Sequence, residues 1–211
     1  MKTIDFNTWP RYKHFQMFSH FDYPHFNLCV PIDATRVIHS VKKHHFSLTV
    51  AFIYLVSRTA NAFPAFRQRI RDNEVVEHEV VHPSATILSK DDLYSFCYIP
   101  YEADFPKFHE DGNRRIKAVQ EHPILEDEPG MDDLIFVSAL PWIAFTSISH
   151  PIHMHPVDSI PRFSWGKYSE DANKISIPVS VQVHHGLMDG YHVGLYYQHL
   201  QELCDSFETF I

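Results

Sequence analysis

One segment, residues 174–207, constrains the fold more than any other part of the chain. Its first ten positions alternate between polar residues and five apolar ones: Ile175, Ile177, Val179, Val181 and Val183. Such period-two alternation is typical of a β-strand with one buried face. From residue 190 to 207 the apolar residues recur instead at steps of three and four, which is the pattern of an amphipathic helix. A strand followed directly by a helix predicts a sheet with helices packed on it.

Further elements of both kinds are predicted along the chain. Pro10 opens a helix over 9–21, Asp33 is the predicted cap of a helix that ends near 43, and Ser47 caps one that ends before Pro64. A polar helix is predicted over 105–120, and Pro178 predicts a sheet edge or a bulge in the last strand. Other strands are predicted over 26–32, 74–79, 84–88, 93–99, 134–140 and 142–148. The expected class is α/β or α+β, a two-layer sandwich of helices on a mixed sheet, with residues 1–211 as one domain.

Composition excludes several classes of partner. Acidic residues outnumber Lys and Arg by 26 to 18, for a formal net charge of −8. A surface of that sign repels phosphate backbones, so no nucleic-acid partner is expected. No apolar run approaches the roughly 18 residues of a membrane span, and residues 1–10 lack a signal core, so we expect no membrane partner and a cytoplasmic location. The chain has no glycine-rich phosphate-loop motif, and its three cysteines share no metal-ligand spacing.

The turn between the last strand and the last helix carries the residues best suited to chemistry. By strand parity His185 lies on the apolar face, whereas His184 lies on the polar one. Desolvation at such a position favours the neutral imidazole that a general base requires. Asp189 stands at the expected cap of the following helix. A core histidine and a helix cap are ordinary features separately, but together as H-x-x-x-D-G they indicate a functional turn.

A second group of histidines offers a different interpretation. His150, His153 and His155 form H-x-x-H-x-H in a proline-containing stretch and are candidate ligands of a transition metal. Asp158 is the one nearby carboxylate that could support them, and metal sites normally need such support. Solvent-exposed loop histidines are therefore the preferred interpretation, and no metal is assigned.

The stretch from Ile177 to Leu203 resembles the C-terminal signature of the type A chloramphenicol acetyltransferases, with its strand, HHxxxDG turn and helix. Other landmarks of that family occur in the same order along nearly the whole chain. They are 9–11, 14–15, 62–67, 81–83, 136–142, 145–147 and 163–168. The spacings also agree, with 26 residues from Ser138 to Ser164 and a further 21 to His185. The resemblance implies the CoA-dependent acyltransferase fold.

The resemblance also implies roles for individual residues. His185 is the implied general base, Ser138 the hydroxyl that stabilises the oxyanion, and Ser164 the hydroxyl that holds a water beside it. Asp189 is implied to pair with Arg11 and so to steady the catalytic turn. Tyr168 is implied to lie near CoA, and Ser47–Thr49 matches a stretch that lines the CoA side. Acetyl-CoA is then a co-substrate, no cofactor is permanently bound, and the expected assembly is a homotrimer with active sites between subunits.

The acceptor pocket departs from the family pattern. Its implied residues are Met17, Phe18, Phe26 and Thr86, and Phe18 stands where familiar members have a tyrosine hydroxyl. Chloramphenicol is the expected acceptor, with antibiotic resistance as the consequence. Another small hydroxylated acceptor is the alternative, since loss of one polar contact changes specificity. A non-catalytic metal-binding or interaction protein is the remaining interpretation, which the joint presence of Ser138, His185, Asp189 and Arg11 disfavours.

Overall fold

A seven-stranded mixed sheet forms the larger layer of the molecule. The computed structural model describes residues 1–89, 92–123, 125 and 130–211. The strands of this sheet are β2 (His25–Asp33), β5 (His82–Leu88), β6 (Tyr94–Tyr98), β7 (Leu134–Leu140), β8 (Arg162–Gly166), β9 (Ser169–Asp171) and β10 (Lys174–His184). Their order is β2-β10-β8-β7-β5-β6, and β9 pairs with the start of β10. Since β7 is parallel to β5 and β8 while the other pairs are antiparallel, the mixed sheet of the sequence prediction is confirmed.

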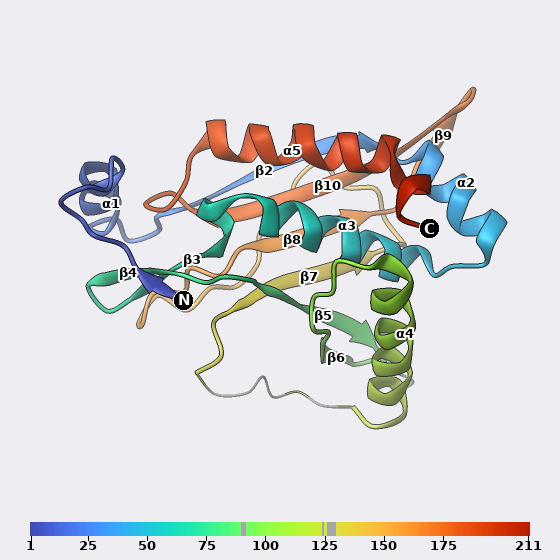
Figure 1. Ribbon diagram of the computed structural model, residues 1–211, viewed down its shortest axis with the longest axis horizontal. Coiled ribbons are helices and arrows are strands. Elements are labelled where there is room, and N and C mark those ends of the chain that lie inside the picture. Colours follow the sequence, from blue (N-terminus) through green and yellow to red (C-terminus); the bar gives the residue numbers. More distant parts are fainter. Residues whose placement is uncertain (90–91, 124, 126–129) are drawn as a thin grey trace.

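The helices form the second layer. They are α1 (Tyr12–Phe18), α2 (Thr35–His44), α3 (Leu48–Ala62), α4 (Phe105–Glu121) and α5 (Gly190–Asp205), with 3-10 turns at Pro64–Arg67 and Phe207–Phe210. Figure 1 shows α3 and α5 running across one face of the sheet, with α4 at the end near β5 and β6. The turn between β10 and α5 lies beside α1, at the left in Figure 1.

Helix α3 fills the space between the layers. The Ser47 hydroxyl caps it by accepting a hydrogen bond from the backbone N–H of Val50 (3.3 Å). Every side chain from residue 50 to 57 is buried, as expected for a helix that is apolar all round. Its Phe52 ring lies 5.5 Å from the ring of Trp165 on β8, so aromatic contacts join the helix layer to the sheet.

The other face of the sheet is polar because side chains alternate along each strand. Trp165 and Phe163 of β8 contact the helices, so Ser164 between them points to the opposite face. Strand register places one hydroxyl on each of four neighbouring strands in a single row. The row runs through Thr86, Ser138, Ser164 and Ser180. Of these four hydroxyls, those of Thr86 and Ser138 line a cavity, whereas Ser164 and Ser180 are buried.

The structure corrects several sequence expectations. The helix predicted over 9–21 is only Tyr12–Phe18, and residues 142–148, predicted as a strand, have no regular secondary structure. Strands β3 (Gln68–Arg71) and β8 were not predicted. The sheet edge predicted at Pro178 is wrong, because β10 is an interior strand and Pro178 faces Pro31 of β2 directly. Neither proline has an N–H to donate, so two opposed prolines leave no donor unpaired. The alternative, a bulge, agrees with the other side of β10, where three residues (166–168) between β8 and β9 lie opposite two (177–178).

A small second sheet lies near the N-terminus. It has the order β1-β4-β3, with β1 (Lys2–Thr3) and β4 (Glu74–Glu77) completing it. Arg69 of β3 is 1% exposed and donates to the backbone carbonyls of Asp132 (2.7 Å) and Leu134. These bonds join the small sheet to the start of β7.

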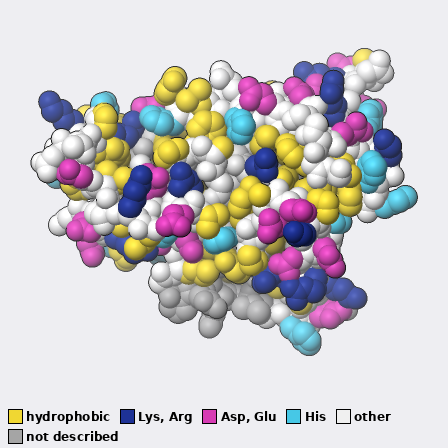
Figure 2. Space-filling model, in the orientation of Figure 1, with side chains coloured by type: hydrophobic (Ala, Val, Ile, Leu, Met, Phe, Trp, Pro, Cys, Tyr) yellow, Lys and Arg dark blue, Asp and Glu magenta, His cyan; other side chains and the backbone are white. Residues whose placement is uncertain are grey.

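The helix-covered surface carries charges of both signs. In Figure 2 acidic and basic side chains gather together over α4, where Asp111 pairs with Arg114 and Arg115. The cations on this helix therefore do not form a separate basic patch. Among the described residues, no helix combines the length and the apolar composition needed to cross a lipid bilayer.

Candidate active site

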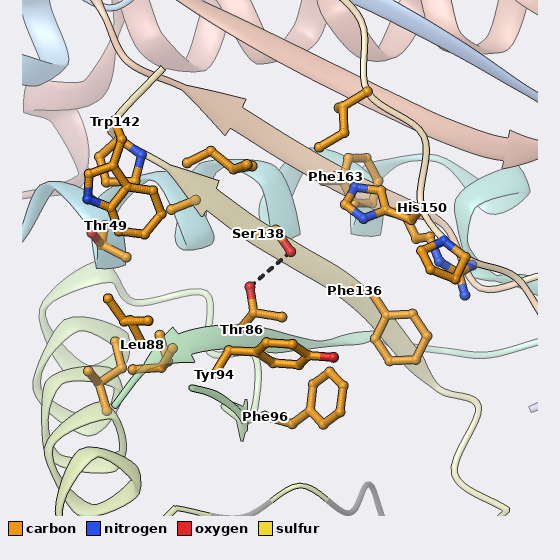
Figure 3. Close-up of a pocket in the computed structure, with 18 of the residues that line it drawn as sticks. Thr49, Thr86, Leu88, Tyr94, Phe96, Phe136, Ser138, Trp142, His150 and Phe163 are labelled. Atoms are coloured by element: carbon orange, nitrogen blue, oxygen red, sulfur yellow. Dashed lines mark hydrogen bonds between the residues drawn. The ribbon is translucent and has the colours of Figure 1, made fainter. Parts of the chain in front are cut away.

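A cavity of about 1060 Å³ opens on the polar face of the sheet. Its walls come from β5, β6 and β7, from the first turn of α3, from α4 and from the loop between β7 and β8. Aromatic side chains dominate the lining, and those labelled in Figure 3 are Tyr94, Phe96, Phe136, Trp142 and Phe163. A large, mostly apolar cavity with a few polar groups is typical of a small-molecule site.

Two hydroxyls lie near the centre of this cavity. Thr86 of β5 donates through Oγ1 to the Ser138 Oγ of β7, at 2.9 Å. The register of the parallel strands explains this contact, because Thr86 and Ser138 are direct partners. With its lone pair engaged by Thr86, the Ser138 hydroxyl keeps its own proton available to donate to an oxygen in the cavity.

The two ends of the cavity differ in exposure. In Figure 3 Thr49 and Trp142 lie on one side of Ser138, and His150 and Phe136 lie on the other. Trp142 is 63% exposed, whereas Arg162, at the His150 end, is 8% exposed. Arg162 is ion-paired with Asp158 and lies over the Phe136 ring, 5.1 Å from its centroid. We call the Trp142 side the open end and the polar Arg162 side, where the charged group is buried, the closed end, although Pro151 and His153 of the lining are exposed there.

His185 lies directly after β10, at the turn to α5. Its ring stacks on Phe18 with the centroids 4.0 Å apart and the planes 11° from parallel, and Phe26 leans against it at 4.7 Å. Its backbone N–H donates to the Pro24 carbonyl (2.7 Å). The ring Nδ1 is buried and has no hydrogen-bonding partner within the described part of the chain. The nitrogen left for proton transfer is thus Nε2.

Arg11 holds the same turn by three hydrogen bonds. Its guanidinium donates to the carbonyl oxygens of His185 (2.7 Å) and Gly186 (3.0 Å) and to the Asp189 carboxylate (2.7 Å). Asp189 also caps α5 by accepting from the Tyr191 N–H (3.0 Å). Burial alone would raise the pKa of Asp189, but hydrogen bonds from Arg11 and His192 hold it well below the usual value. The sequence-predicted contact between Arg11 and Asp189 is thus present.

The structure does not bring His185 and Ser138 together within one chain. Ser138 is in register with Ser164 and, through it, with Ser180 of β10. His185 lies five residues further along that strand direction, so the two side chains are separated by about 17 Å along the strands and about 10 Å across them. The cavity lining includes Ser138 but neither His185 nor its ring partners.

The other predicted site residues divide between these two places. Thr86 lines the cavity, whereas Phe18 and Phe26 contact His185, and Met17 is exposed nearby on α1. The predicted CoA-side residue Tyr168 is 40% exposed and is absent from the cavity lining. His184 is buried against His25, and burial is the main cause that lowers the pKa of His184 to about 3. His184 is therefore a neutral core residue, although strand parity places it on the polar face and His185 on the apolar one.

The surroundings of Ser164 differ from those expected for a hydroxyl that holds a water beside the oxyanion. It is fully buried and does not line the cavity; its hydroxyl contacts the Nε2 of His150 at 2.8 Å. The sequence analysis considered His150 as a metal ligand or, preferably, as a solvent-exposed loop histidine. Among the described residues no group of three His, Cys, Asp or Glu side chains could hold a metal ion, so His150 and its neighbours form no such site.

Comparison with known proteins completes this description. The family model for chloramphenicol acetyltransferase matches residues 1–201. The chloramphenicol acetyltransferase of Klebsiella sp is 32% identical over 209 residues, which are 98% of this chain and 94% of the relative. That of Bacillus pumilus is 31% identical over 210 residues, 97% of this chain and 95% of the relative.

Solved structures agree with the family match. A chloramphenicol acetyltransferase has a TM-score of 0.84 at 25% identity and covers 95% of this chain and 98% of its own. A probable dihydrolipoamide acetyltransferase from Listeria monocytogenes shares the fold, with a TM-score of 0.69 at 16% identity and coverage of 92% and 89%. Since a family model and relatives match nearly the whole chain, it belongs to the chloramphenicol acetyltransferase family of CoA-dependent O-acetyltransferases.

Proposed function

We propose that this chain transfers an acetyl group from acetyl-CoA to a hydroxyl of chloramphenicol. His185 is the general base and Ser138 the oxyanion donor. The observation that carries the proposal is the His185 imidazole: packed on aromatic rings and fixed at a turn that Arg11 braces, it leaves Nε2 for proton transfer. The family match supplies the donor and the acceptor class.

The chemical step follows from these groups. Nε2 takes the proton of the acceptor hydroxyl while the hydroxyl oxygen attacks the thioester carbonyl carbon. The carbonyl oxygen becomes an oxyanion, and the Ser138 hydroxyl donates to it. The C–S bond then breaks, and the CoA thiolate leaves with the proton from the imidazolium, so that the base is regenerated.

The shape of the cavity supports an assignment of its two ends. CoA is long and highly charged, so its bulk belongs at the open end, near Thr49, Gln120 and Trp142. The smaller acceptor belongs at the closed end, near Phe136 and His150. The acetyl group then lies between them, beside Ser138 and Thr86.

The proposed reaction geometry requires a second copy of the chain. His185 and Ser138 are too far apart in one chain to act on one substrate, and a neighbouring copy that presents His185 to the cavity removes this conflict. Apolar side chains around the His185 end are exposed and would be covered by that copy: Met17, Phe21, Tyr23 and Leu28. We take the assembly to be the homotrimer of the family, and the location to be the cytoplasm.

The test is acetyl-CoA-dependent thiol release by the purified protein. Chloramphenicol is compared with a panel of other small alcohols, and acetylated product is identified by mass spectrometry. Release that depends on chloramphenicol supports the proposal. If thiol is released with another alcohol but not with chloramphenicol, that alcohol is the acceptor instead. If no acceptor supports release, the transferase function is rejected.

A further inference from the structure

His150 occupies the place in the cavity that the sequence assigned to Ser164. It belongs to the irregular loop between β7 and β8, and its Nε2 lies 2.8 Å from the Ser164 Oγ. Ser164 is 0% exposed, whereas His150 lines the cavity at its closed end. The imidazole therefore lies between the serine hydroxyl and any molecule in the cavity.

The His150 backbone is fixed to the sheet. Its N–H donates to the Oε1 of Gln182 (2.8 Å), and the Nε2 of Gln182 donates to the His150 carbonyl (3.4 Å). Gln182 is 2% exposed and also donates to the Tyr23 hydroxyl (3.1 Å). A ring held by Gln182 at its backbone and by Ser164 at its far nitrogen has one preferred orientation, and this is the condition for a specific polar contact.

The second ring nitrogen is left for a ligand. Within the described ranges, Nδ1 of His150 has no hydrogen-bonding partner and is not one of the buried unpaired atoms. Burial, aided by the Arg162 charge, lowers the pKa of His150, so the ring is neutral near pH 7. A neutral imidazole has one donor and one acceptor nitrogen, so the bond to Ser164 determines which role remains at Nδ1.

We propose that His150 is a specificity-determining residue of the acceptor site, which contacts a polar group of the acceptor through Nδ1 while Ser164 positions the ring. This inference rests on the proposed function, because it takes the closed end of the cavity as the acceptor end. The favoured acceptor is a molecule with a hydrogen-bonding group, besides the reacting hydroxyl, that reaches this end. An acceptor that is purely apolar there leaves Nδ1 unpaired and binds more weakly.

Three substitutions separate the two nitrogens. His150→Leu removes both; His150→Asn places an amide near the Nδ1 position and His150→Gln places one near the Nε2 position. Steady-state kinetics with chloramphenicol and acetyl-CoA give the two KM values and kcat for each variant. His155→Leu is the matched control, because His155 lies in the same loop, is exposed and is absent from the cavity lining.

We expect the chloramphenicol KM to rise only in the variants that lose the polar group at the Nδ1 position. His150→Leu and His150→Gln should raise the chloramphenicol KM about tenfold, the effect of losing one hydrogen bond of about 1.4 kcal/mol. The acetyl-CoA KM should change less than about twofold, and His150→Asn should restore most of the chloramphenicol affinity.

Other outcomes overturn the inference. An unchanged chloramphenicol KM in His150→Leu shows that the ring makes no contact with the acceptor. Rescue by Gln but not by Asn shows that His150 acts only through Ser164. If the unsubstituted protein transfers acetyl groups to no acceptor, the proposed function fails first and this inference fails with it.

Discussion

At the scale of single residues, proton transfer depends on how one imidazole is held. The stack on Phe18 and the backbone bond to Pro24 fix the position of His185 without using its Nε2. Its neighbour His184 has the opposite surroundings, since it is 2% exposed and its Nδ1 accepts the Gly186 N–H at 3.0 Å. In the proposed reaction the two adjacent histidines thus have separate tasks, His185 in proton transfer and His184 in the core.

His185→Ala should lower kcat by at least about a hundredfold, because a positioned base contributes on the order of 10²–10⁴ in rate. The thermal midpoint should change by less than about 2 °C, since the ring is only half-buried and carries no side-chain hydrogen bond among the described residues. Thiol-release kinetics and calorimetry measure both effects. His39→Ala, at an exposed position on α2, is the control. A variant that retains a substantial part of the activity refutes the assignment of the base.

Asp189→Asn should destabilise the protein by about 2 kcal/mol at pH 7, the scale of a lost charged hydrogen bond, and so lower the thermal midpoint by roughly 4–8 °C. It should also slow transfer, because the turn loses its contact with Arg11. Asp171→Asn, at an exposed carboxylate, is the control. A thermal midpoint equal to that of the unsubstituted protein contradicts a stabilising pair.

The same variant has a defined pH dependence. The folded pKa of Asp189 lies below its unfolded value of about 3.9, so the ion pair contributes its full stability only above about pH 4. That stability is lost as the pH falls through the folded pKa. The difference between Asp189→Asn and the unsubstituted protein should therefore be constant at neutral pH and shrink in acid. Thermal scans from pH 7 to pH 3 measure it.

Residue-level prediction from sequence identified the histidine turn and two residues of the cavity, Ser138 and Thr86, but not the place of His150 in it. His185, Asp189 and Arg11 belong to a motif of fixed spacing, so their contacts could be predicted from the resemblance. The contact between His150 and Ser164 depends on how an irregular loop folds back over the sheet, and no periodic pattern encodes that path. The roles of the site residues stay predictions until the variants are measured.

At the scale of elements, sequence patterns predicted the helices and strands whose surroundings are uniform along their length. The alternation from Ile175 to Val183 gave β10, and the continuous apolar run between Ser47 and Pro64 gave α3. Residues 142–148 are apolar and aromatic like a strand, but Trp142 and Ile143 are exposed. The short strand β3 could not be predicted because it lacks apolar alternation: the residues of Gln68–Arg71 are polar or charged except Ile70.

Arg69→Met should destabilise the protein by about 3 kcal/mol, because the Arg69 guanidinium satisfies the Asp132 and Leu134 carbonyls, which join β3 to the start of β7. Burial lowers the pKa of Arg69 to about 10, so the lost group is a cation at neutral pH. Arg71→Met is the control on the same strand; it removes an ion pair with Asp132 in which the Arg71 side chain is 42% exposed, and it should cost less than Arg69→Met. Urea unfolding at fixed protein concentration measures both, and equal losses contradict a structural role specific to Arg69.

At the scale of the whole molecule, the separation of His185 from Ser138 predicts complementation between inactive chains. His185→Ala and Ser138→Ala should each be nearly inactive alone, and the second should lose roughly 10²–10³-fold in kcat. A mixed oligomer that pairs His185 of one copy with Ser138 of another contains intact sites. In a closed ring of three chains, each mixed oligomer has one intact site out of three, so it should restore roughly a third of the activity.

The complementation experiment uses co-expression with two different affinity tags and sequential purification, so that only mixed oligomers are assayed. Light scattering gives the number of chains, for which we expect three. Each variant expressed alone with both tags is the control. Mixed oligomers no more active than these controls would show that one chain carries the whole site.

The stacking of Phe18 on His185 also determines the direction in which a proton can travel. The lone pair of an imidazole nitrogen lies in the plane of the ring, whereas the aromatic contact occupies a face. A rotation of the ring toward a differently placed alcohol would break that contact. With Nδ1 enclosed, protons enter and leave along one line, through the Nε2 edge. If His185 is the proposed base, alcohols that cannot align their O–H bond with that line should be poor substrates, however tightly they bind.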